Sequence, residues 1–460
     1  MPPSAIDLGA LRRELTSGRS NVLALRVPAG RALQLVDADF GHTSVFWEAA
    51  ATAGHAPTSI VGVDSAALLK ASGSARFPAM IDLQAAALSG LRGESDVCAR
   101  VRFFGGSAFS SGRDGSGCWE DFGDSTFVLP RVLYIDGPET AELLIVDPPG
   151  APGGTDRTLA VLDWVLTRLA APPPASAETT SVEASRQSAT EEDFEALVAQ
   201  AQERIRSGQV DKVALARRET LTLASAPSPS GLLQRLRTTA AGATRFAFRI
   251  GERTFIGATP ESLLRRQGLL IETEALAGTA ARTALGSAAD LLASAKDQDE
   301  HRYVVAALQA ALAPLCKRLD VAPEAIVKEL PRLLHLCTPI VGELERPLHV
   351  LDLVARLHPT PAVCGSPTDQ AFRFIIEHEA APRGWYAAPF GWTDGAGNGH
   401  FVVGLRSALL HGNKVHLYAG AGIVRDSTPK LEYEETELKL ESIRSALGLG
   451  TTAHGPSAPA

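Results

Sequence analysis

The sequence predicts a large globular protein in which helices and strands mix without a regular βαβ alternation. The chain has 460 residues, enough for one very large domain or roughly two to three ordinary ones. Apolar residues make up 45% and charged residues 21%, so a sizeable core is expected and global disorder is not.

Residues 1–170 contain most of the strand-like segments of the first half of the chain. Apolar or alternating runs of strand length lie at residues 21–29, 32–37, 99–109, 126–136 and 141–148, and helical patterns at 67–73 and 157–170. Residues 171–190 are rich in Pro, Ala, Ser and Thr and lack apolar periodicity, which is typical of a linker or surface loop.

Residues 191–448 form the second predicted region. It opens with a helix for which Thr190 is the predicted N-cap, because acidic residues follow at once and an apolar stripe begins at Phe194. Strand patterns lie at residues 210–219, 246–251, 253–258, 269–276, 401–410 and 414–424, and helical patterns at 287–319, 370–380 and 431–447. Residues 449–460 are expected to be a disordered tail.

Composition excludes several classes of protein. The net charge of −8 argues against a nucleic-acid binder, and no run approaches the ~18 apolar residues that a membrane span requires. The N-terminus lacks the apolar segment of a secretory signal. We therefore expect a soluble, cytoplasmic protein with reduced thiols. The cysteines are odd in number and form no CxxC pair, so neither a disulfide framework nor a zinc site is predicted; they are Cys98, Cys118, Cys316, Cys337 and Cys364. Nothing in the sequence activates Cys364, which we interpret as a buried structural residue.

Residues 430–439 hold four glutamates in ten positions. At helical spacing Glu432, Glu435 and Lys439 share one face, while Glu434 and Glu437 point elsewhere. The segment is either a solvated surface helix or a helix whose inner face binds a cation.

Three further charged residues lie in apolar surroundings. Lys212 occupies an alternating strand pattern, either as a desolvated base or as an edge lysine that reaches water. Glu261 follows a proline after a strand, where it is either an acid or an ordinary helix-N-terminal carboxylate. Glu300 shares a helix face with apolar residues and needs a partner or a metal there.

Other residues suit an anionic ligand. Arg406 lies within an apolar strand and requires a carboxylate partner, which a substrate could supply. The backbone N–H groups at Gly278 and Thr279 could hold an anion, and Gly420 and Gly422 allow close approach of a ligand.

Taken in order, several segments resemble those of the chorismate-utilising enzymes, specifically the isochorismate synthases. The matching strings are VDKVALAR, GATPESLL, LAGT, DEHRYVV, LHPTPAVCG, RGWYAAPFGW, VVGLRSALL and YAGAGIVRDSTPKLEYEETELK, within residues 190–448. Residues 1–170 match only through FFGGSAF and FVLPR. Within the family, three strings are more similar to the menaquinone-pathway branch than to the siderophore branch: RGWYAAPFGW, LRSALL and EYEETELKL. The resemblance implies one large α+β domain, in which two stacked, mostly antiparallel sheets surround a deep cleft, with helices outside and residues 1–170 in the same body.

The resemblance also implies residue roles. Lys212 would activate water for attack on ring carbon C2 of chorismate, and Glu261 would protonate the departing C4 hydroxyl. Glu300 and Glu435, with Glu432 nearby, would hold Mg²⁺. Burial would favour the neutral lysine and the protonated acid that this reaction needs. The substrate-binding residues implied are Gly278, Thr279, His335, Tyr386, Arg406, Gly420, Gly422 and Lys439. The chain departs from the family pattern at Ala275 and Ala280, which leaves the position of the loop around Thr279 open.

Other activities remain as alternatives. Salicylate synthases, which go on to eliminate pyruvate from isochorismate, also carry this lysine. Family members that add ammonia carry other residues at the position of Lys212, so no glutamine amidotransferase partner is expected. A catalytically inactive chorismate-binding relative and a metal-dependent hydrolase are the remaining readings. Chorismate is the expected partner, nucleic acid and membrane are not, and the oligomeric state, which includes a monomer, stays open.

Overall fold

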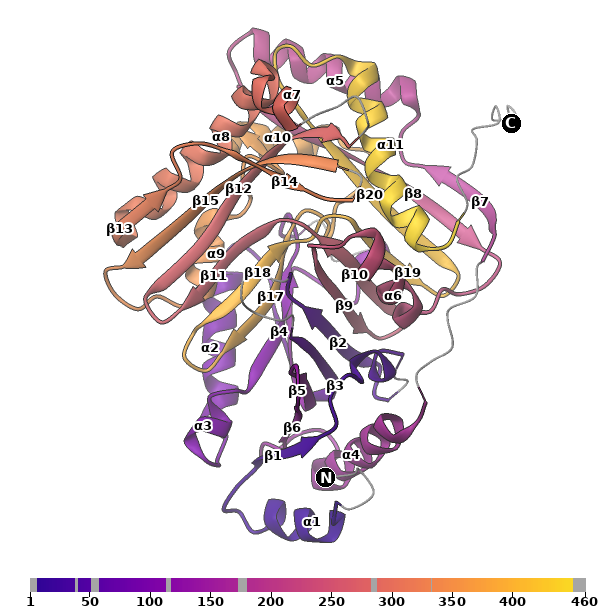
Figure 1. The fold of residues 1–460 in the computed structure, drawn as a ribbon, viewed down its shortest axis with the longest axis vertical. Coiled ribbons are helices and arrows are strands. Elements are labelled where there is room, and N and C mark those ends of the chain that lie inside the picture. The colour runs from indigo at the N-terminus through magenta and orange to yellow at the C-terminus, as the bar shows by residue number, and fades with distance from the viewer. Residues whose placement is uncertain are drawn as a thin grey trace.

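The computed structural model describes residues 6–37, 40–50, 58–112, 117–172, 180–282, 288–331 and 333–449. It shows antiparallel strands joined into one large sheet with helices on the outside (Figure 1). The predicted α+β class is confirmed.

The sheet has two arms that meet at β5 (Ser125–Asp136). One edge of β5 begins the first arm, in the order β3 (Ser59–Ala71), β2 (Thr43–Glu48), β9 (Thr244–Ile250), β10 (Arg253–Thr259), β19 (Ser407–His411), β20 (Lys414–Ile423) and β8 (Lys212–Leu223). The other edge begins the second arm, in the order β4 (Arg102–Ser107), β17 (Pro389–Asp394), β18 (Gly399–Val403), β11 (Ser262–Gln267), β12 (Leu270–Ala281) and β15 (Leu333–Leu344). The two stacked sheets of the prediction are thus two arms of one hydrogen-bonded sheet.

Shorter strands extend these arms. They are β1 (Val22–Val27) and β6 (Ala141–Val146) beside β5, β7 (Val182–Gln187) and β16 (Gly365–Ser366) on β8, and β13 (Cys316–Val321) and β14 (Ile326–Glu329) on β15.

The two arms pack face to face through buried aromatic rings. The ring centroid of Phe390 on β17 lies 4.9 Å from that of Phe246 on β9 and 6.0 Å from that of Trp47 on β2. Phe248 stacks on Trp385 at 5.7 Å. Such pairs each contribute about 0.5–1.5 kcal/mol beyond the burial of their area, so this layer fixes the separation of the arms.

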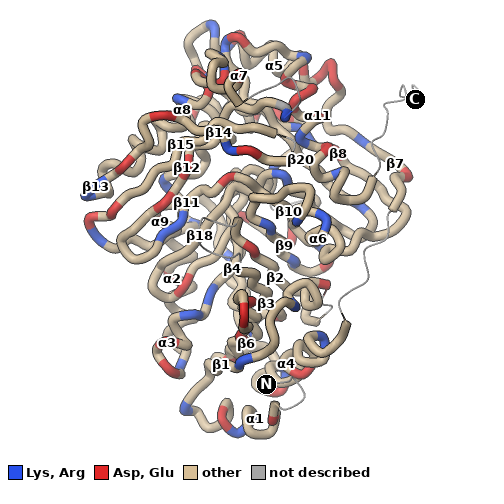
Figure 2. The backbone as a smooth tube through the Cα atoms, viewed as in Figure 1, with Lys and Arg blue, Asp and Glu red and all other residues tan. Residues whose placement is uncertain are grey.

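Helices cover the outer faces of both arms. They are α1 (Leu8–Thr16), α2 (Arg76–Ser89), α3 (Ser95–Cys98), α4 (Gly154–Ala170), α5 (Glu191–Arg206), α6 (Pro229–Thr239), α7 (Ala288–Ala293), α8 (Ala295–Leu312), α9 (Val350–Leu357), α10 (Thr368–His378) and α11 (Pro429–Ala446). Two of them matter most for function, because α8 packs on β12 and α11 packs on β20. Among the described helices, none is long and apolar enough to cross a bilayer. Acidic and basic positions are interspersed along the chain (Figure 2).

Several local predictions were wrong. Residues 32–37 were expected to form a strand, but Ala32–Leu35 is a 3₁₀ helix. Residues 67–73 were expected to be helical, but most of them are the end of β3, because pairing with β5 outweighs the helix propensity of the segment. The helix predicted to reach residue 319 ends earlier, and β13 begins at Cys316.

The boundary of the second region is partly as predicted. Thr190 caps α5 with a reciprocal capping box to Asp193. Within the predicted linker at 171–190, however, Val182–Gln187 pairs with β8 as an edge strand. Residues 173–179 and the predicted tail from residue 450 onward lie outside the described residues.

Candidate active site

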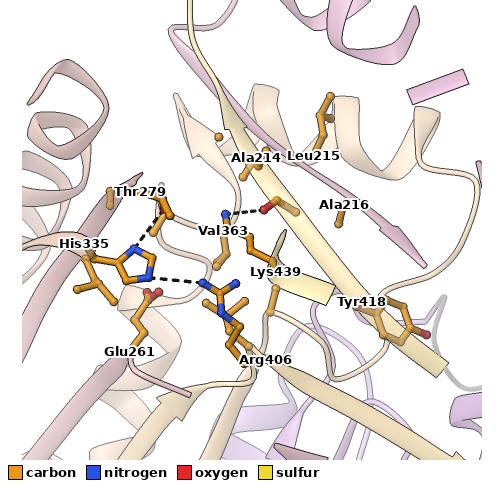
Figure 3. Close-up of a pocket in the computed structure, with 18 of the residues that line it drawn as sticks. Ala214, Leu215, Ala216, Glu261, Thr279, His335, Val363, Arg406, Tyr418 and Lys439 are labelled. Carbon is orange, nitrogen blue, oxygen red and sulfur yellow. Dashed lines mark hydrogen bonds between the residues drawn. The ribbon is translucent and has the colours of Figure 1, made fainter. Parts of the chain in front are cut away.

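A cavity lies between the two arms, with walls from β8 and β20 of the first arm and β12 and β15 of the second (Figure 3). Ten of the predicted site residues line it: Glu261, Gly278, Thr279, Glu300, His335, Tyr386, Arg406, Gly420, Gly422 and Lys439. Lys212, Glu432 and Glu435 do not line the cavity. Lys212 and Glu435 contact the lining residues Glu300 and Lys439, and Glu432 contacts Lys296.

Lys212 is completely buried, which excludes the edge lysine that reaches water. Its Nζ lies 2.9 Å from Oε1 of Glu300 on α8. Gly422 makes this approach possible, because a Cβ there would lie 2.3 Å from Oε1 of Glu300. Burial would raise the pKa of Glu300, but the ion pair with Lys212 and the nearby Lys439 and Lys296 lower it below its ordinary value.

Glu261 lies in a two-residue break between β10 and β11. A strand follows it, so it is not a helix-N-terminal carboxylate. Only 5% of the residue is exposed. Burial, and then the neighbouring Glu274, raise the pKa of Glu261 to about 8 against the opposing effect of nearby lysines. The carboxyl group is therefore mostly protonated at neutral pH.

His335 links two predicted ligand-binding residues. Its Nδ1 lies 3.1 Å from Oγ1 of Thr279, and its Nε2 lies 3.5 Å from Nη2 of Arg406 (Figure 3). Burial, and then Arg406 and Lys439, lower the pKa of His335 well below its ordinary value. Because a guanidinium can only donate, the neutral ring accepts at Nε2 and carries its proton on Nδ1.

Arg406 was expected within a strand, but it lies in the bend between β18 and β19. Its backbone adopts the left-handed conformation with φ of 48°. Its carbonyl accepts a hydrogen bond from the backbone N–H of Ala258 at 3.1 Å. This conformation is costly for a non-glycine residue, so the surrounding strands hold the guanidinium at the cavity wall.

The predicted anion site at Gly278 and Thr279 is arranged differently from the expectation. Gly278 takes a positive φ of 76° beside a bulge in β12. The backbone N–H of Thr279 donates to Asp297 Oδ1 at 3.3 Å, so it does not point to a free anion. The polar group that Thr279 places at the cavity is its hydroxyl, which is hydrogen-bonded to His335.

The sequence interpretation missed two polar residues of the cavity wall. Tyr418 stacks on Tyr386 with ring centroids 5.1 Å apart, and its hydroxyl accepts from Nε1 of Trp119 at 2.9 Å. Burial raises the pKa of Tyr386 to about 12, so its hydroxyl keeps its proton. Tyr418 could have been found, because it alternates with Gly420 and Gly422 along one face of a strand.

Arg383 is the other missed residue, and it holds backbone of the wall in place. Its guanidinium is paired with Glu379 and donates to the carbonyls of Val363 and Ala214 at 2.6 and 2.7 Å. The neighbouring Cys364 is fully buried, and burial raises the pKa of its thiol to about 12, which confirms the structural interpretation.

The face of α11 predicted to carry chemistry does turn inward. Glu435 Oε1 lies 2.5 Å from Nζ of Lys439, which in turn donates to the carbonyl of Gly420 at 2.8 Å. Glu432 is 1% exposed and pairs with Lys296 at 2.7 Å. Burial, and then Glu435, raise the pKa of Glu432, so these two carboxylates lie close enough to repel each other.

The outer face of α11 is only partly solvated. Glu434 is exposed as expected. Glu437 is not: it is half-buried and forms ion pairs with Arg217 on β8 and with Arg444. Helix α11 therefore contacts β8 through Glu437 as well as packing on β20. The sequence pattern had predicted only one buried face and one solvated face.

These carboxylates have the chemistry of a Mg²⁺ site. Glu300, Glu432 and Glu435 offer only oxygen donors, the type that Mg²⁺ prefers. Each of the three carboxylates is paired with a lysine. The described residues contain no group of three or more His, Cys, Asp or Glu side chains already gathered to hold an ion. A cation would replace the lysine charges.

Comparison with known proteins identifies the family of this chain. Residues 17–448 match the profile of a family described as chorismate binding enzyme. The salicylate biosynthesis isochorismate synthase of Pseudomonas aeruginosa is 40% identical over 339 residues, 72% of this chain and 70% of that one. Isochorismate synthase MenF of Bacillus subtilis is 35% identical over 353 residues, 75% of this chain and 74% of that one.

A solved structure has the same overall fold. MenF, the menaquinone-specific isochorismate synthase from Escherichia coli, superposes with a TM-score of 0.79 and 26% identity over 96% of this chain and 98% of that one. With the family profile spanning nearly the whole chain, and with two relatives matched over more than two thirds of their length, the chain belongs to the chorismate-binding enzymes.

Proposed function

We propose that the protein is a Mg²⁺-dependent isochorismate synthase, which converts chorismate to isochorismate. The observation that carries this proposal is the pair of buried groups at the cavity: Glu261, whose pKa is raised to about 8, and Lys212, which contacts the lining residue Glu300. The relatives named above support the same reaction, since each is described as an isochorismate synthase.

The reaction is an allylic displacement that needs an acid and a base. Lys212 takes a proton from the water that attacks C2, and Glu261 gives its proton to the C4 hydroxyl, which leaves as water while both ring double bonds shift by one position. Glu261 is already in the required form at neutral pH. Nζ of Lys212 lies 2.9 Å from Oε1 of Glu300, so this contact must open before the lysine can act as a base. Each role typically contributes ~10²–10⁴-fold to the rate.

Chorismate carries two carboxylates, and the cavity offers separate partners for them. Arg406 and the Tyr386 hydroxyl suit the pyruvyl carboxylate. His335 and Thr279 line the part of the wall nearer the ring carboxylate. Glu300, Glu435 and Glu432 would hold Mg²⁺, which supplies positive charge for that ring carboxylate when bound.

The isochorismate that we propose as the product has two candidate pathways. Likeness to the two MenF proteins favours menaquinone biosynthesis. The 40% identical Pseudomonas relative, which is described as acting in salicylate biosynthesis, favours salicylate as a second candidate. Deleting the gene in its own host and measuring menaquinone and salicylate would separate the two, because only the product of the pathway served should fall.

Turnover in ¹⁸O-labelled water tests the mechanism. Water attack places one ¹⁸O at C2 of isochorismate, and Lys212→Ala and Glu261→Gln should each slow this labelling by ~10²–10⁴-fold. Isochorismate without label would show that the hydroxyl moves within the substrate, and the assigned roles would then be wrong.

A further inference from the structure

An ion pair between Lys328 and Glu274 lies beside the backbone that carries Glu261. Nζ of Lys328 on β14 donates to Oε1 of Glu274 on β12 at 2.6 Å. The side chains are 25% and 17% exposed, so the pair is largely withdrawn from water.

The same pair holds the backbone on both sides of Glu261. Nζ of Lys328 also donates to the carbonyl of Pro260 at 2.6 Å. Oε1 of Glu274 also accepts from the backbone N–H of Ser262 at 3.1 Å. Because Pro260 has no N–H, its carbonyl is the only backbone group through which it can be hydrogen-bonded.

The break between β10 and β11 needs such support. Residues 260 and 261 belong to neither strand and lack the regular ladder bonds that fix their neighbours. Other contacts to Glu261 are a 3.3 Å bond from its N–H to Oγ1 of Thr259 and a 3.2 Å bond from the N–H of Val403 to its carbonyl. A misplacement of about 1 Å at a reacting group can cost ~10²-fold in rate, so a tether on each side is consequential.

We propose that Glu274 and Lys328 are positioning residues for the acid: together they fix the backbone on both sides of Glu261. Their opposite charges also act on the nearby Glu261 carboxyl group. This inference rests on the acid role proposed for Glu261. It adds Glu274 from β12 and Lys328 from β14 to the residues that support the active site.

The charges around Glu261 support this assignment. After burial, Glu274 is the neighbour that raises the pKa of Glu261, while lysines lower it. The ionisable groups that face Glu261 from the surrounding elements are Glu274, Lys328, Lys212, Lys439, Cys337, Tyr386 and Arg406. Glu274 and Lys328 oppose each other, so neutralising either one must move the proton affinity of Glu261 in a predictable direction.

The test uses two variants that keep hydrogen-bonding capacity but lose charge. In Glu274→Gln the alkaline limb of the pH profile of kcat/KM should move to lower pH by ~1 unit, because a nearby negative charge is lost. In Lys328→Gln it should move to higher pH by a similar amount, with kcat lowered by the weaker hold on Pro260. Glu272→Gln is the matched control, since Glu272 lies on the same strand in an exposed pair with Arg265 and should leave the limb unmoved. A purely structural role would lower kcat in both variants without opposite shifts.

A direct titration separates this inference from the proposed function. Carbon-13 NMR of glutamate-labelled, substrate-free protein reports the Glu261 carboxyl, which is identified by its absence in Glu261→Gln. Opposite shifts of its titration in the two variants are expected. An unmoved titration in both variants overturns the inference, whatever the kinetics show. Shifted titrations with an unmoved pH–rate limb would instead overturn the acid role of Glu261 on which the catalytic part rests.

Discussion

At the scale of single residues, environment decides what each side chain can do. Glu261 and Glu300 are both buried glutamates at one cavity, yet their pKa values move in opposite directions. The difference comes from their partners, because Glu300 contacts the ammonium of Lys212 and Glu261 has the carboxylate of Glu274 nearby. Two carboxylates with separated proton affinities are suited to different tasks.

The first prediction concerns the stability of the protein against pH. Because the pKa of Glu261 rises from 4.5 unfolded to about 8 folded, the folded state binds more protons in this window. Stability is therefore lost as pH rises from about 4.5 to about 8, by roughly 3–5 kcal/mol from this group. Glu261→Gln should remove the loss and be more stable than wild type above pH 8, although inactive. Urea unfolding of both proteins across this range measures it. Parallel stability curves would mean that Glu261 is ionised in the folded protein.

A second prediction concerns Gly422. A Cβ at this position would lie 2.3 Å from Oε1 of Glu300 and 3.0 Å from Cε of Lys212, so Gly422→Ala must displace the pair. We expect turnover to fall by ~10²-fold or more. The control is Gly90→Ala, where the φ is −85° and the nearest atom would be 3.7 Å away. Steady-state rates of both variants decide the matter, and a fully active Gly422→Ala would show that this pair is not needed in place.

At the scale of elements, each strand or helix near the cavity contributes side chains at a fixed spacing. On β20, Tyr418, Gly420 and Gly422 alternate toward the cavity, and on α11, Glu432, Glu435 and Lys439 share the inner face. Both periodicities could be seen in the sequence. The ion pairs of Glu437 with Arg217 and Arg444 could not, because they depend on which strand lies beneath the helix.

The third prediction concerns the inner face of α11. Glu435→Gln should raise the Mg²⁺ concentration needed for half-maximal turnover by more than the ~10–100-fold typical of outer-shell partners, since a direct ligand charge is lost. Folding should stay nearly intact, because glutamine has the same size and can still accept a hydrogen bond from Lys439. Glu434→Gln makes the same charge change one position away on the exposed face and serves as control. Calorimetric titration with Mg²⁺ complements the rates. An unchanged Mg²⁺ dependence would remove this face from the metal site.

At the scale of the whole molecule, residues from both halves of the chain share one sheet. β2 lies between β3 and β9, and β4 pairs with β17, so strands before residue 171 sit beside strands after residue 190. Trp119, from the first half, also donates to Tyr418 in the cavity wall.

This interleaving gives the fourth prediction. A fragment of residues 191–449 would expose the edges of β9 and β17 and half of the aromatic layer, so it should not fold cooperatively. The full chain should unfold in one transition by calorimetry and circular dichroism. A monomeric fragment with a sharp thermal transition would contradict this.

Local pattern predicted strongly periodic elements better than elements that are defined by pairing with distant strands. Strands β8, β10 and β20 and helices α10 and α11 were expected nearly where they lie. β2, β3 and β15 were missed or misread, because their identity depends on pairing with distant strands. The resemblance named ten of the residues that line the cavity but not Glu274 or Lys328, whose contacts with Ser262 and Pro260 on either side of Glu261 exist only once the sheet is assembled.

The proposed reaction is tested by incubating the purified protein with chorismate, with and without Mg²⁺, separating the products by chromatography and assaying pyruvate. We expect a mixture of isochorismate and residual chorismate that forms only with Mg²⁺, without salicylate or pyruvate. Accumulation of salicylate and pyruvate would identify a salicylate synthase instead, and chorismate that binds but is recovered unchanged would contradict the proposed reaction.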